Sequence, residues 1–479
     1  MEIIVIISGL CIAAIASFVF TERAIVESLS ILASAVSFIF SVEIGTKVAA
    51  VGSYDPTYLF SVNSMSAVVL MIVSFVGLVV TIYSVAYLRE ETGKGVIGIS
   101  RVRQYFILLN LFLVTMILAI TVNSPIFAWI AIEATTLSTA FLISFYNNPS
   151  AMEAAWKYLV INSVGLLLAF FGTLLYFTSM GSVGGAIIGW QTLVANAINL
   201  NPLIVKTAFI FVLVGYGTKV GLAPMHTWLP DAHSKAPAPV SALLSGVLLN
   251  VALVTVLRFK VITDSVVGGA FSQNLLVTFG VLSILIAAFI ILTQKDFKRL
   301  LAYSSIENMG IMSLGFGFGG LGIFAATLHL IYHALLKSAM FLSAGTIYLR
   351  YGTTRISEVR GAIKALPITG LVFLTGFFAI TGTPPFGVFL TKIYILSAGI
   401  ISYPLISAVV LLLLAIMFVG FFKHTTSMVF GDKPEAVLNG EDNIWLTIPP
   451  LLLILIVLFL SFHLPSFIYT LLNSIALHY

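Results

Sequence analysis

Residues 215–224 read GYGTKVGLAP, and this stretch decides the fold class because it places a lysine, three glycines and a proline in an apolar run. Proline removes a backbone N–H and clashes with the preceding helical turn, and glycine permits the irregular backbone that results. Freed backbone groups are tolerated at membrane depth only where protein or a water-filled cavity satisfies them. The stretch therefore predicts a helix broken inside a bilayer beside a buried cation, Lys219.

A second interruption matches the first. Residues 382–387 read GTPPFG, and Lys392 follows five positions later. Paired broken helices are typical of inverted repeats that build an ion site near the membrane midplane. Each half would hold five segments, and an odd number inverts one half relative to the other. The other interpretation, two unrelated packing kinks, stays open.

The composition outside these stretches supports a membrane protein. Hydrophobic residues make up 60% of the 479 positions and charged residues only 9%, against about 25% charged in soluble domains. Long continuous apolar runs favour helices over a β-barrel. We expect an all-α membrane protein of about 14 transmembrane helices, with two inverted five-helix repeats that each contain a broken helix. The segments cover roughly residues 3–20, 25–42, 62–88, 104–122, 125–146, 157–178, 203–223, 237–257, 274–293, 300–318, 322–349, 367–398, 404–422 and 445–472.

The segments group into four parts. Residues 181–202 are only half apolar and are expected at the membrane interface. The predicted parts are the N-terminal helices (1–103), the first inverted repeat (104–260), the second inverted repeat (261–423) and a C-terminal helix (424–479).

Lysine and arginine are distributed unevenly between the two sides. Sixteen of the 23 lie in connections after odd-numbered segments, four in the others, and three, Lys219, Lys337 and Lys392, inside segments. Basic loops face the cytoplasm, so both termini should lie on the non-cytoplasmic side of the cell's inner (cytoplasmic) membrane. The net charge of +5 is spread over these loops, which gives no sign of a nucleic-acid partner.

The first half carries an acidic and a basic residue that do not belong in a bilayer. Glu133 lies near the middle of segment 125–146 and Lys219 in segment 203–223. An unpaired charge there is costly, so we expect the two to face one another and to titrate together. A static buried ion pair is the alternative. Glu153 and Lys157, at the start of the next segment, either supply ions to Glu133 or mark the membrane interface.

The second half carries a line of titratable residues. His329, His333 and Lys337 are spaced four apart, which stacks them on one helix face. Histidine titrates near neutral pH and suits proton relay. A structural polar stripe and a metal site are the alternatives, but no third ligand is evident and the lysine would repel a cation. We therefore predict no metal.

Two further features adjoin this line. Lys392 extends it into segment 367–398, and Glu307 is either a partner of Lys392 or the histidines, or an interfacial charge. The connection 224–239 is dense in titratable groups and reads either as an ion-uptake point on the cytoplasmic side or as a solvated turn. Its titratable members include His226, Asp231 and His233.

Redox chemistry is not expected in this chain. Cys11 is its one cysteine, whereas an iron–sulfur cluster needs about four thiolates. We predict no cofactor and no catalytic residue for electron transfer, which would take place in other subunits.

Three spaced motifs resemble a known family. The run 219–244, with a proline five and a histidine seven positions after the lysine, is similar to the antiporter-like subunits of respiratory complex I and Mrp-type cation/proton antiporters. The motifs DFKRLLAYS (296–304) and HxxxHxxxK (329–337) are similar to the same subunits, and the resemblance spans nearly the whole chain. WIAIEATT (129–136), AWKY (155–158) and SIENMG (305–310) resemble the F component of hydrogenase-4-type complexes, membrane relatives of complex I built around a NiFe hydrogenase.

The resemblance implies a 14-helix core with two inverted repeats and an H⁺- or Na⁺-translocating subunit of a redox-driven complex. Partners would be other membrane and peripheral subunits, including antiporter-like or small Mrp-type ones. The alternatives are a subunit of a stand-alone Mrp-type antiporter and a scaffold that has lost transport. The implied ion pathway consists of Glu133, Lys219, His329, His333, Lys337 and Lys392, with Lys157 matching a common lysine.

Segment eight departs from the family pattern. Many relatives carry a lysine or histidine there that links the two halves, whereas this chain has Ser245 and Asn250. Neither side chain can hold a proton charge. The link between the halves must then use water or another residue, or be missing.

Overall fold

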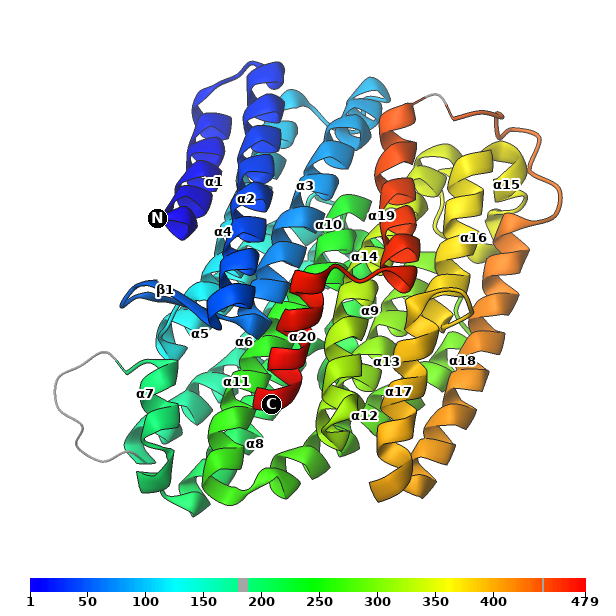
Figure 1. The fold of residues 1–479 in the computed structure, drawn as a ribbon. Coiled ribbons are helices and arrows are strands. Elements are labelled where there is room, and N and C mark those ends of the chain that lie inside the picture. The colour runs from blue at the N-terminus through cyan, green and yellow to red at the C-terminus, as the bar shows by residue number, and fades with distance from the viewer. Residues whose placement is uncertain (180–187, 442) are drawn as a thin grey trace.

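A computed structural model describes residues 1–179, 188–441 and 443–479, and nearly all of them lie in helices of one bundle (Figure 1). Within these residues, twelve helices are long and apolar enough to cross a membrane, and Pro367–Thr381 and Gly387–Ser402 are shorter apolar helices. The predicted class, an all-α multi-pass membrane protein, is confirmed. The number 14 and the inverted repeats stay predictions.

Three helices and a hairpin form the N-terminal part. The hairpin, which the sequence did not predict, pairs Ser53 with Asn63 in antiparallel register. The Asn63 side chain then accepts a hydrogen bond from the Ser66 N–H and caps the following helix. The elements are α1 (Glu2–Val19), α2 (Arg23–Val51), β1 (Ser53–Thr57), β2 (Phe60–Asn63) and α3 (Ser64–Gly93).

The next group contains the first broken helix. Part of the predicted interfacial stretch, residues 181–187, lies outside the described residues, and the remainder forms short helices. The elements are α4 (Ile99–Thr121), α5 (Pro125–Ile143), α6 (Pro149–Ser179), α7 (Trp190–Ala195), η1 (Ala197–Asn199), α8 (Pro202–Val220), η2 (Met225–Thr227), α9 (Trp228–Lys235), α10 (Ala238–Leu243), the π-helix η3 (Leu244–Leu248) and α11 (Leu249–Val267).

The last group contains the second broken helix. The predicted segment 445–472 is two helices, because Pro465 lacks a backbone N–H and starts a new one. The elements are α12 (Gly269–Ile291), α13 (Phe297–Phe318), α14 (Leu321–Tyr351), η4 (Ile356–Glu358), α15 (Ala362–Ala365), α16 (Pro367–Thr381), α17 (Gly387–Ser402), α18 (Pro404–Val429), α19 (Ile444–Phe462) and α20 (Ser466–His478).

The junctions drawn between the four predicted parts fall inside helices. Residues 103/104 lie in α4, 260/261 in α11 and 423/424 in α18. The helices continue past the apolar runs because the charged side chains at their ends are themselves packed or paired, as with the buried Lys260. The division into the four parts 1–103, 104–260, 261–423 and 424–479 stays a prediction.

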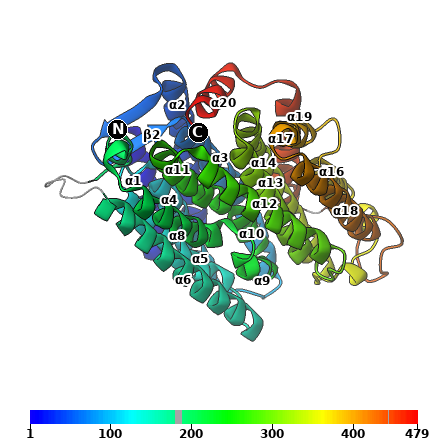
Figure 2. The same cartoon turned by 90° about the horizontal axis from the view of Figure 1, so that it is seen from below.

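The two broken helices lie on opposite sides of the bundle when it is viewed along its length (Figure 2). Helix α8 packs on α6 on one side. Helices α16 and α17 pack on α14 and α18 toward the opposite side. Helix α14 occupies the centre and contacts α3, α10, α13, α16, α17 and α19.

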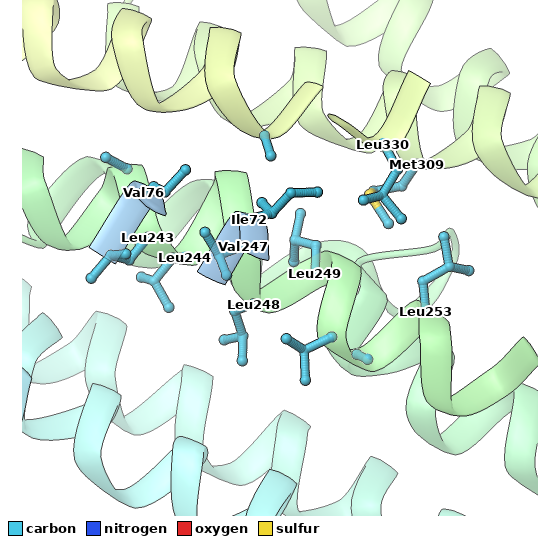
Figure 3. Close-up of a cluster of buried hydrophobic side chains, with 14 of the residues drawn as sticks. Ile72, Val76, Leu243, Leu244, Val247, Leu248, Leu249, Leu253, Met309 and Leu330 are labelled. Atoms are coloured by element: carbon cyan, nitrogen blue, oxygen red, sulfur yellow. The ribbon is translucent and has the colours of Figure 1, made fainter. Parts of the chain in front are cut away.

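An apolar cluster surrounds the π-helix η3 between the two halves (Figure 3). Gly246 allows η3 to approach α14, since a Cβ there would lie 2.5 Å from Ser338 Oγ and 2.8 Å from the Ala334 carbonyl oxygen. The cluster includes Ile72, Val76, Leu243, Leu244, Val247, Leu248, Leu249, Leu253, Met309 and Leu330, all buried except for a few per cent of Ile72.

Both chain ends lie near the hairpin. The Met1 amino group donates to Tyr54 Oη at 3.2 Å, and Ser64 Oγ on α3 donates to Ser474 Oγ on α20 at 3.0 Å. The ends therefore share one end of the bundle. The side of the membrane on which that end lies stays a prediction.

Candidate functional site

The first broken helix is interrupted at Gly221. Helix α8 ends there with the glycine at φ +82°, in the left-handed region, and a cis Ala223–Pro224 bond follows. The freed backbone groups find partners: Trp228 Nε1 donates to the Thr218 carbonyl oxygen at 2.8 Å, and the Ala223 N–H donates to Ser283 Oγ at 2.9 Å. The break is thus satisfied by protein contacts, as membrane depth requires.

Lys219 stands two residues before this break and is fully buried. Its Nζ donates to Thr136 Oγ1 on α5 at 2.9 Å and to Tyr158 Oη on α6 at 2.5 Å, and it lies 4.7 Å from the centre of the Tyr158 ring. Tyr158 Oη in turn bonds Thr139 Oγ1 at 2.5 Å. Neutral oxygens and a ring therefore hold the ammonium group.

Glu133 lies on α5, one turn before Thr136, and is half-buried. Its Oε1 accepts from Ser163 Oγ on α6 at 2.9 Å, and its Oε2 is buried without a hydrogen-bond partner in the described chain. The expected direct pairing with Lys219 is absent from the ion pairs of the described residues. The hydroxyls of Thr136 and Tyr158 take the ammonium hydrogens instead, and the carboxylate remains a neighbour.

The second break repeats the backbone pattern with a different lysine position. Helix α16 ends at Gly382, with φ +88°, and a cis Pro384–Pro385 bond precedes α17. Lys392, on α17, pairs with Glu307 Oε1 at 2.8 Å and donates to the carbonyl oxygens of Ile380 and Thr381 at 3.3 Å each. Carbonyls left open by the break therefore solvate this cation.

A hydrogen-bonded chain leads from Glu307 to α14. Asn308 Nδ2 donates to Glu307 Oε2 at 2.5 Å, Asn308 Oδ1 bonds His329 Nε2 at 2.9 Å, and His329 Nδ1 bonds Thr391 Oγ1 at 2.8 Å. Since an amide oxygen only accepts, this arrangement places a proton on Nε2 of His329. Of the two interpretations of Glu307, the structure places it as a buried partner of Lys392, joined to His329 through Asn308.

His333 and Lys337 continue along α14 as the spacing predicts. Both are fully buried. Neither ring nitrogen of His333 has a hydrogen-bond partner among the described residues. Lys337 Nζ donates to the Leu301 carbonyl oxygen on α13 at 2.9 Å. The line of three therefore contains one fully bonded histidine, one unbonded histidine and a lysine held by a single carbonyl.

The connection 224–239 is folded and largely buried. Asp231 pairs with Arg299 Nη1 at 2.8 Å and with Lys157 Nζ at 3.5 Å, and Lys157 pairs with Glu153 at 2.6 Å. These four form one ion network at the surface. Within the described residues, no hydrogen bond or ion pair joins Glu153 or Lys157 to Glu133. The idea that they supply ions to Glu133 stays a prediction.

The two histidines of that connection point elsewhere. His226 is 6% exposed and its ring lies 6.4 Å from that of Tyr303. His233 is fully buried, stacks on Phe341 with ring centres 4.8 Å apart, and has no hydrogen-bond partner for either ring nitrogen in the described chain. A plain solvated turn does not describe this stretch.

Segment eight carries one polar contact to α13. Ser245 Oγ, in η3, bonds Ser305 Oγ at 2.6 Å. Asn250 Nδ2 donates to the Gly246 carbonyl oxygen of its own helix at 2.8 Å, and its Oδ1 has no partner in the described residues. A π-helix in a transmembrane position frequently marks a functional site, but its side chains here are mainly apolar.

Several buried charges were not singled out from the sequence: Glu27 lies inside the predicted segment 25–42, and Glu91 and Lys260 lie just beyond the ends of the predicted segments 62–88 and 237–257. Glu27 is 2% exposed and pairs with Arg23 at 2.6 Å and Arg89 at 2.5 Å. Lys260 pairs with Asp264 at 2.6 Å. Glu91 is equally buried, on the last turn of α3. For Glu91 and Lys260, the available signal was a helix that continues past the end of its apolar run.

Two surface cavities lie away from the predicted residues. One of about 570 Å³ lies between β2, α7, α11 and α20 and is lined by Arg258, among others. One of about 330 Å³ lies at the opposite end and is lined by Glu90 and Lys94, among others. Neither is lined by a residue of the predicted ion pathway, so the site consists of buried polar groups packed between helices.

Family models match most of the chain. The model described as "NADH:quinone oxidoreductase/Mrp antiporter, TM" matches residues 122–420. A second, described as "NADH-Ubiquinone oxidoreductase (complex I), chain 5 N-terminus", matches residues 48–95. The first match alone contains both broken helices and every residue of the predicted ion pathway.

Two curated relatives share substantial identity with the chain. It is 39% identical over 357 residues to the hydrogenase-4 component F homolog of Methylacidiphilum infernorum (isolate V4), covering 74% of this chain and 75% of that protein. It is 30% identical over 362 residues to hydrogenase-4 component B of Escherichia coli (strain K12), covering 72% of this chain and 52% of that protein. The chain thus spans most of the first relative and about half of the second.

Solved structures share the fold across the whole chain. A chain of the membrane-bound sulfane sulfur reductase, an archaeal respiratory membrane complex, superposes with a TM-score of 0.89 at 22% identity, covering 100% of this chain and 98% of that one. A chain of the Mrp complex from Dietzia sp. DQ12-45-1b gives 0.86 at 19% identity, covering 99% and 96%.

Proposed function

The chain belongs to the family of NADH:quinone oxidoreductase and Mrp antiporter membrane subunits, and on that premise we propose that it translocates H⁺, Na⁺ or both as the antiporter-like subunit of a redox-driven membrane complex. The parent complex would be a membrane-bound NiFe hydrogenase or another relative of complex I. Its other membrane and peripheral subunits would be the partners. The chain would lie in the inner membrane with both ends on the non-cytoplasmic side.

One observation carries this proposal. Titratable side chains are buried in two clusters, each built on a broken helix, and each is bonded to groups that can exchange protons. Lys219 contacts Tyr158 and Thr136 in the first, and Lys392 reaches His329 through Glu307 and Asn308 in the second. Ionisable groups inside a membrane mark ion pathways by default because burying them without a purpose is costly.

The proposed mechanism begins at the first cluster. Electron transfer in partner subunits shifts charge near one end of the chain, and Lys219 moves between the Glu133 side and the central groups on α14. An ion is taken up from the cytoplasm and released outward near Lys392. Moving one charge through 100 mV requires about 2.3 kcal/mol, and making or breaking a buried ion pair can supply several kcal/mol.

The contacts of Lys219 suit this role. Its ammonium is bonded to neutral hydroxyls, so a change of partner breaks no ion pair in the described structure. The unbonded Oε2 of Glu133 offers a second position nearby. A lysine already locked to a carboxylate would resist the same movement.

The test uses the complex purified by a tag on this chain and reconstituted in vesicles. Redox-driven ion uptake is measured for the wild type, for Lys219→Ala and for Lys206→Ala, which changes an exposed lysine on the same helix. We expect uptake to be lost only in Lys219→Ala. Unchanged pumping in that variant would remove Lys219 from the mechanism, and the copurified subunits would identify the electron-transfer partner.

The likeness to the Mrp complex favours a second candidate, a subunit of a stand-alone cation/proton antiporter. In that case only membrane subunits copurify, and an imposed ion gradient drives exchange without an electron donor. The apolar surroundings of segment eight favour a third, a scaffold without transport. Ion uptake that persists after both Glu133 and Lys219 are neutralised would support the scaffold.

A further inference from the structure

Glu91 is a buried carboxylate that the proposed pathway does not use. It lies in the last turn of α3, two residues before the helix ends at Gly93, and residues 93–95 are exposed. Its own side chain is 2% exposed. The acidic group is therefore close to the Lys/Arg-rich end of the bundle and yet shielded from solvent.

Tyrosines surround one side of this carboxylate. Tyr146 Oη, beyond the end of α5, donates to Glu91 Oε1 at 2.5 Å, and Tyr146 Oη and Tyr87 Oη lie 3.1 Å apart. Glu91 Oε2 has no hydrogen-bond partner in the described part of the chain. A buried carboxylate oxygen normally has one, so this oxygen is an open position for a proton.

A buried lysine, Lys298, contacts the chain directly after α9, the helix that carries His233. Lys298 is 4% exposed, donates to the Ala236 carbonyl oxygen at 2.8 Å and lies 5.7 Å from the centre of the Tyr348 ring. It forms no ion pair with Glu91 in the described residues. The two groups nevertheless adjoin the same turn of α14, because Lys94, three residues after Glu91, donates to the Leu349 carbonyl oxygen, next to Tyr348.

His233 completes the arrangement. It lies three residues before Ala236, whose carbonyl oxygen accepts from Lys298, and its ring stacks on Phe341, one turn along α14 from Lys337. Both of its ring nitrogens are buried without a partner among the described residues. Glu91, Lys298, His233 and Lys337 thus follow one another from the exposed end of α3 toward the centre of α14.

We propose that Glu91 is the proton acceptor at the Lys/Arg-rich end of the bundle and that it loads His233 and Lys337. The Glu91 carboxylate takes a proton from cytoplasmic water, a ring nitrogen of His233 receives it, and Lys337 accepts it as a neutral amine. Tyr146 is a positioning residue, because its hydroxyl group holds the carboxylate. This role rests on the proposed function, since it supplies the proton that the central groups pass on.

The same contacts select H⁺ over Na⁺ at this position. Hard cations are bound by several oxygen ligands at once, whereas one oxygen of the Glu91 carboxylate already accepts a hydroxyl hydrogen from Tyr146. A cation would displace that hydrogen bond. A proton needs only the open oxygen.

The experiment compares three variants of the purified complex in vesicles. Glu91→Gln removes the acceptor, Glu91→Asp keeps it, and Glu90→Gln makes the same change at a neighbour that lines the surface cavity. We expect Glu91→Gln to slow redox-driven proton uptake about a hundredfold, the lower end for a positioned proton-transfer group. Glu91→Asp should restore much of the rate, and Glu90→Gln should match the wild type. Wild-type uptake by Glu91→Gln would overturn the proposal.

A second variant covers the case in which Glu91→Gln does not assemble. Tyr146→Phe keeps the ring and removes only the hydroxyl that bonds Glu91. We expect slower uptake and a shift in the pH at which uptake is half maximal, which a purely structural tyrosine would not produce. An unchanged rate and pH profile would count against Glu91 as acceptor.

The outcome separates the two proposals. If the wild-type complex moves no ions, the proposed function fails. If the wild type pumps, Lys219→Ala does not, and Glu91→Gln pumps normally, only the role of Glu91 fails.

Discussion

The two broken helices share a backbone and differ in how they hold their lysine. In both, a glycine with positive φ ends the first half-helix and a cis proline bond follows. Lys219 precedes its break and is bonded to two hydroxyls. Lys392 follows its break and is bonded to Glu307 and two carbonyls.

This difference indicates that Lys219 is free to change partners and that Lys392 is fixed. Hydroxyls are neutral, so Lys219 can leave them without stranding a buried charge. Glu307 is 2% exposed, so losing Lys392 would strand a carboxylate in an apolar interior. The first half is thus suited to switching and the second to holding charge for release.

Glu307→Gln should have the largest effect on the second half. The change leaves Lys392 buried without its counter-charge, and breaking a buried pair in this manner typically destabilises by about 3–5 kcal/mol. We expect this loss to exceed those of Gly215→Ala, Lys219→Met and Ser245→Ala. Thermal unfolding of the purified complex in detergent measures it.

The double variant Glu307→Gln with Lys392→Met serves as control. Removing both charges should recover most of the lost stability, because neither buried group is then left alone. A double variant that is no more stable than Glu307→Gln would mean that Lys392 is solvated by its two carbonyls and does not need the carboxylate.

Helix packing behind the first break gives the next effect. A Cβ on Gly215 would fall against the Ala169 backbone nitrogen and lie 2.6 Å from the Gly165 carbonyl oxygen, so Gly215→Ala must push α8 away from α6. We expect a loss of about 1–3 kcal/mol and displacement of Lys219 from Tyr158. Unfolding and ion uptake are measured together.

Gly217→Ala is the matched change on the same helix. Its Cβ would meet two side-chain tips, Met225 Cε at 3.3 Å and Leu222 Cδ1 at an ordinary contact distance of 3.7 Å. It should unfold close to the wild type. Equal losses in the two variants would show that helix α8 is sensitive to any added methyl group rather than to this backbone contact.

Lys219→Met should separate stability from transport. Methionine has a similar length, and the Tyr158 hydroxyl that Lys219 leaves keeps Thr139 as a partner. We expect a stability change below about 1.5 kcal/mol, as for a volume-conserving replacement, together with loss of pumping. A loss as large as that of Glu307→Gln would show that Lys219 also depends on a charged partner, and the contrast between the halves would disappear.

The sequence was most informative where a feature has a local signal. Glycine and proline located both breaks, because they act on their own backbone. Spacing placed His329, His333 and Lys337 on one face of α14, because a helix fixes that geometry. Glu307 was left between two interpretations, since its distance from Lys392 in sequence gives no hint of their contact.

Other contacts could not be read from the sequence. The expected pairing of Glu133 with Lys219 ignored Thr136 and Tyr158. In the structure their hydroxyl groups accept the hydrogen bonds of the Lys219 ammonium group. Glu91 was left in a loop because α3 continues a turn past its apolar run. Such groups are buried by helices distant in sequence, and no local pattern reports that.

The smallest expected effect tests whether the halves communicate. Ser245 Oγ bonds Ser305 Oγ at 2.6 Å, Ser305 Oγ donates to the Leu301 carbonyl oxygen at 3.1 Å, and Lys337 Nζ donates to that same oxygen at 2.9 Å. These contacts form a polar thread from η3 to α14, beside the apolar cluster drawn in Figure 3. Ser245→Ala removes its first link.

We expect Ser245→Ala to lower stability by about 1 kcal/mol, the usual size of one hydrogen bond, and to slow ion uptake a few-fold. Ser343→Ala is the control, because within the described residues the hydroxyl of that buried serine bonds only the Ala339 carbonyl oxygen of its own helix. If Ser245→Ala loses stability and pumps at the wild-type rate, the thread is structural. The switching lysine and the fixed lysine would then serve separate ion paths, and the contrast between the two halves would reflect two functions rather than two stages of one.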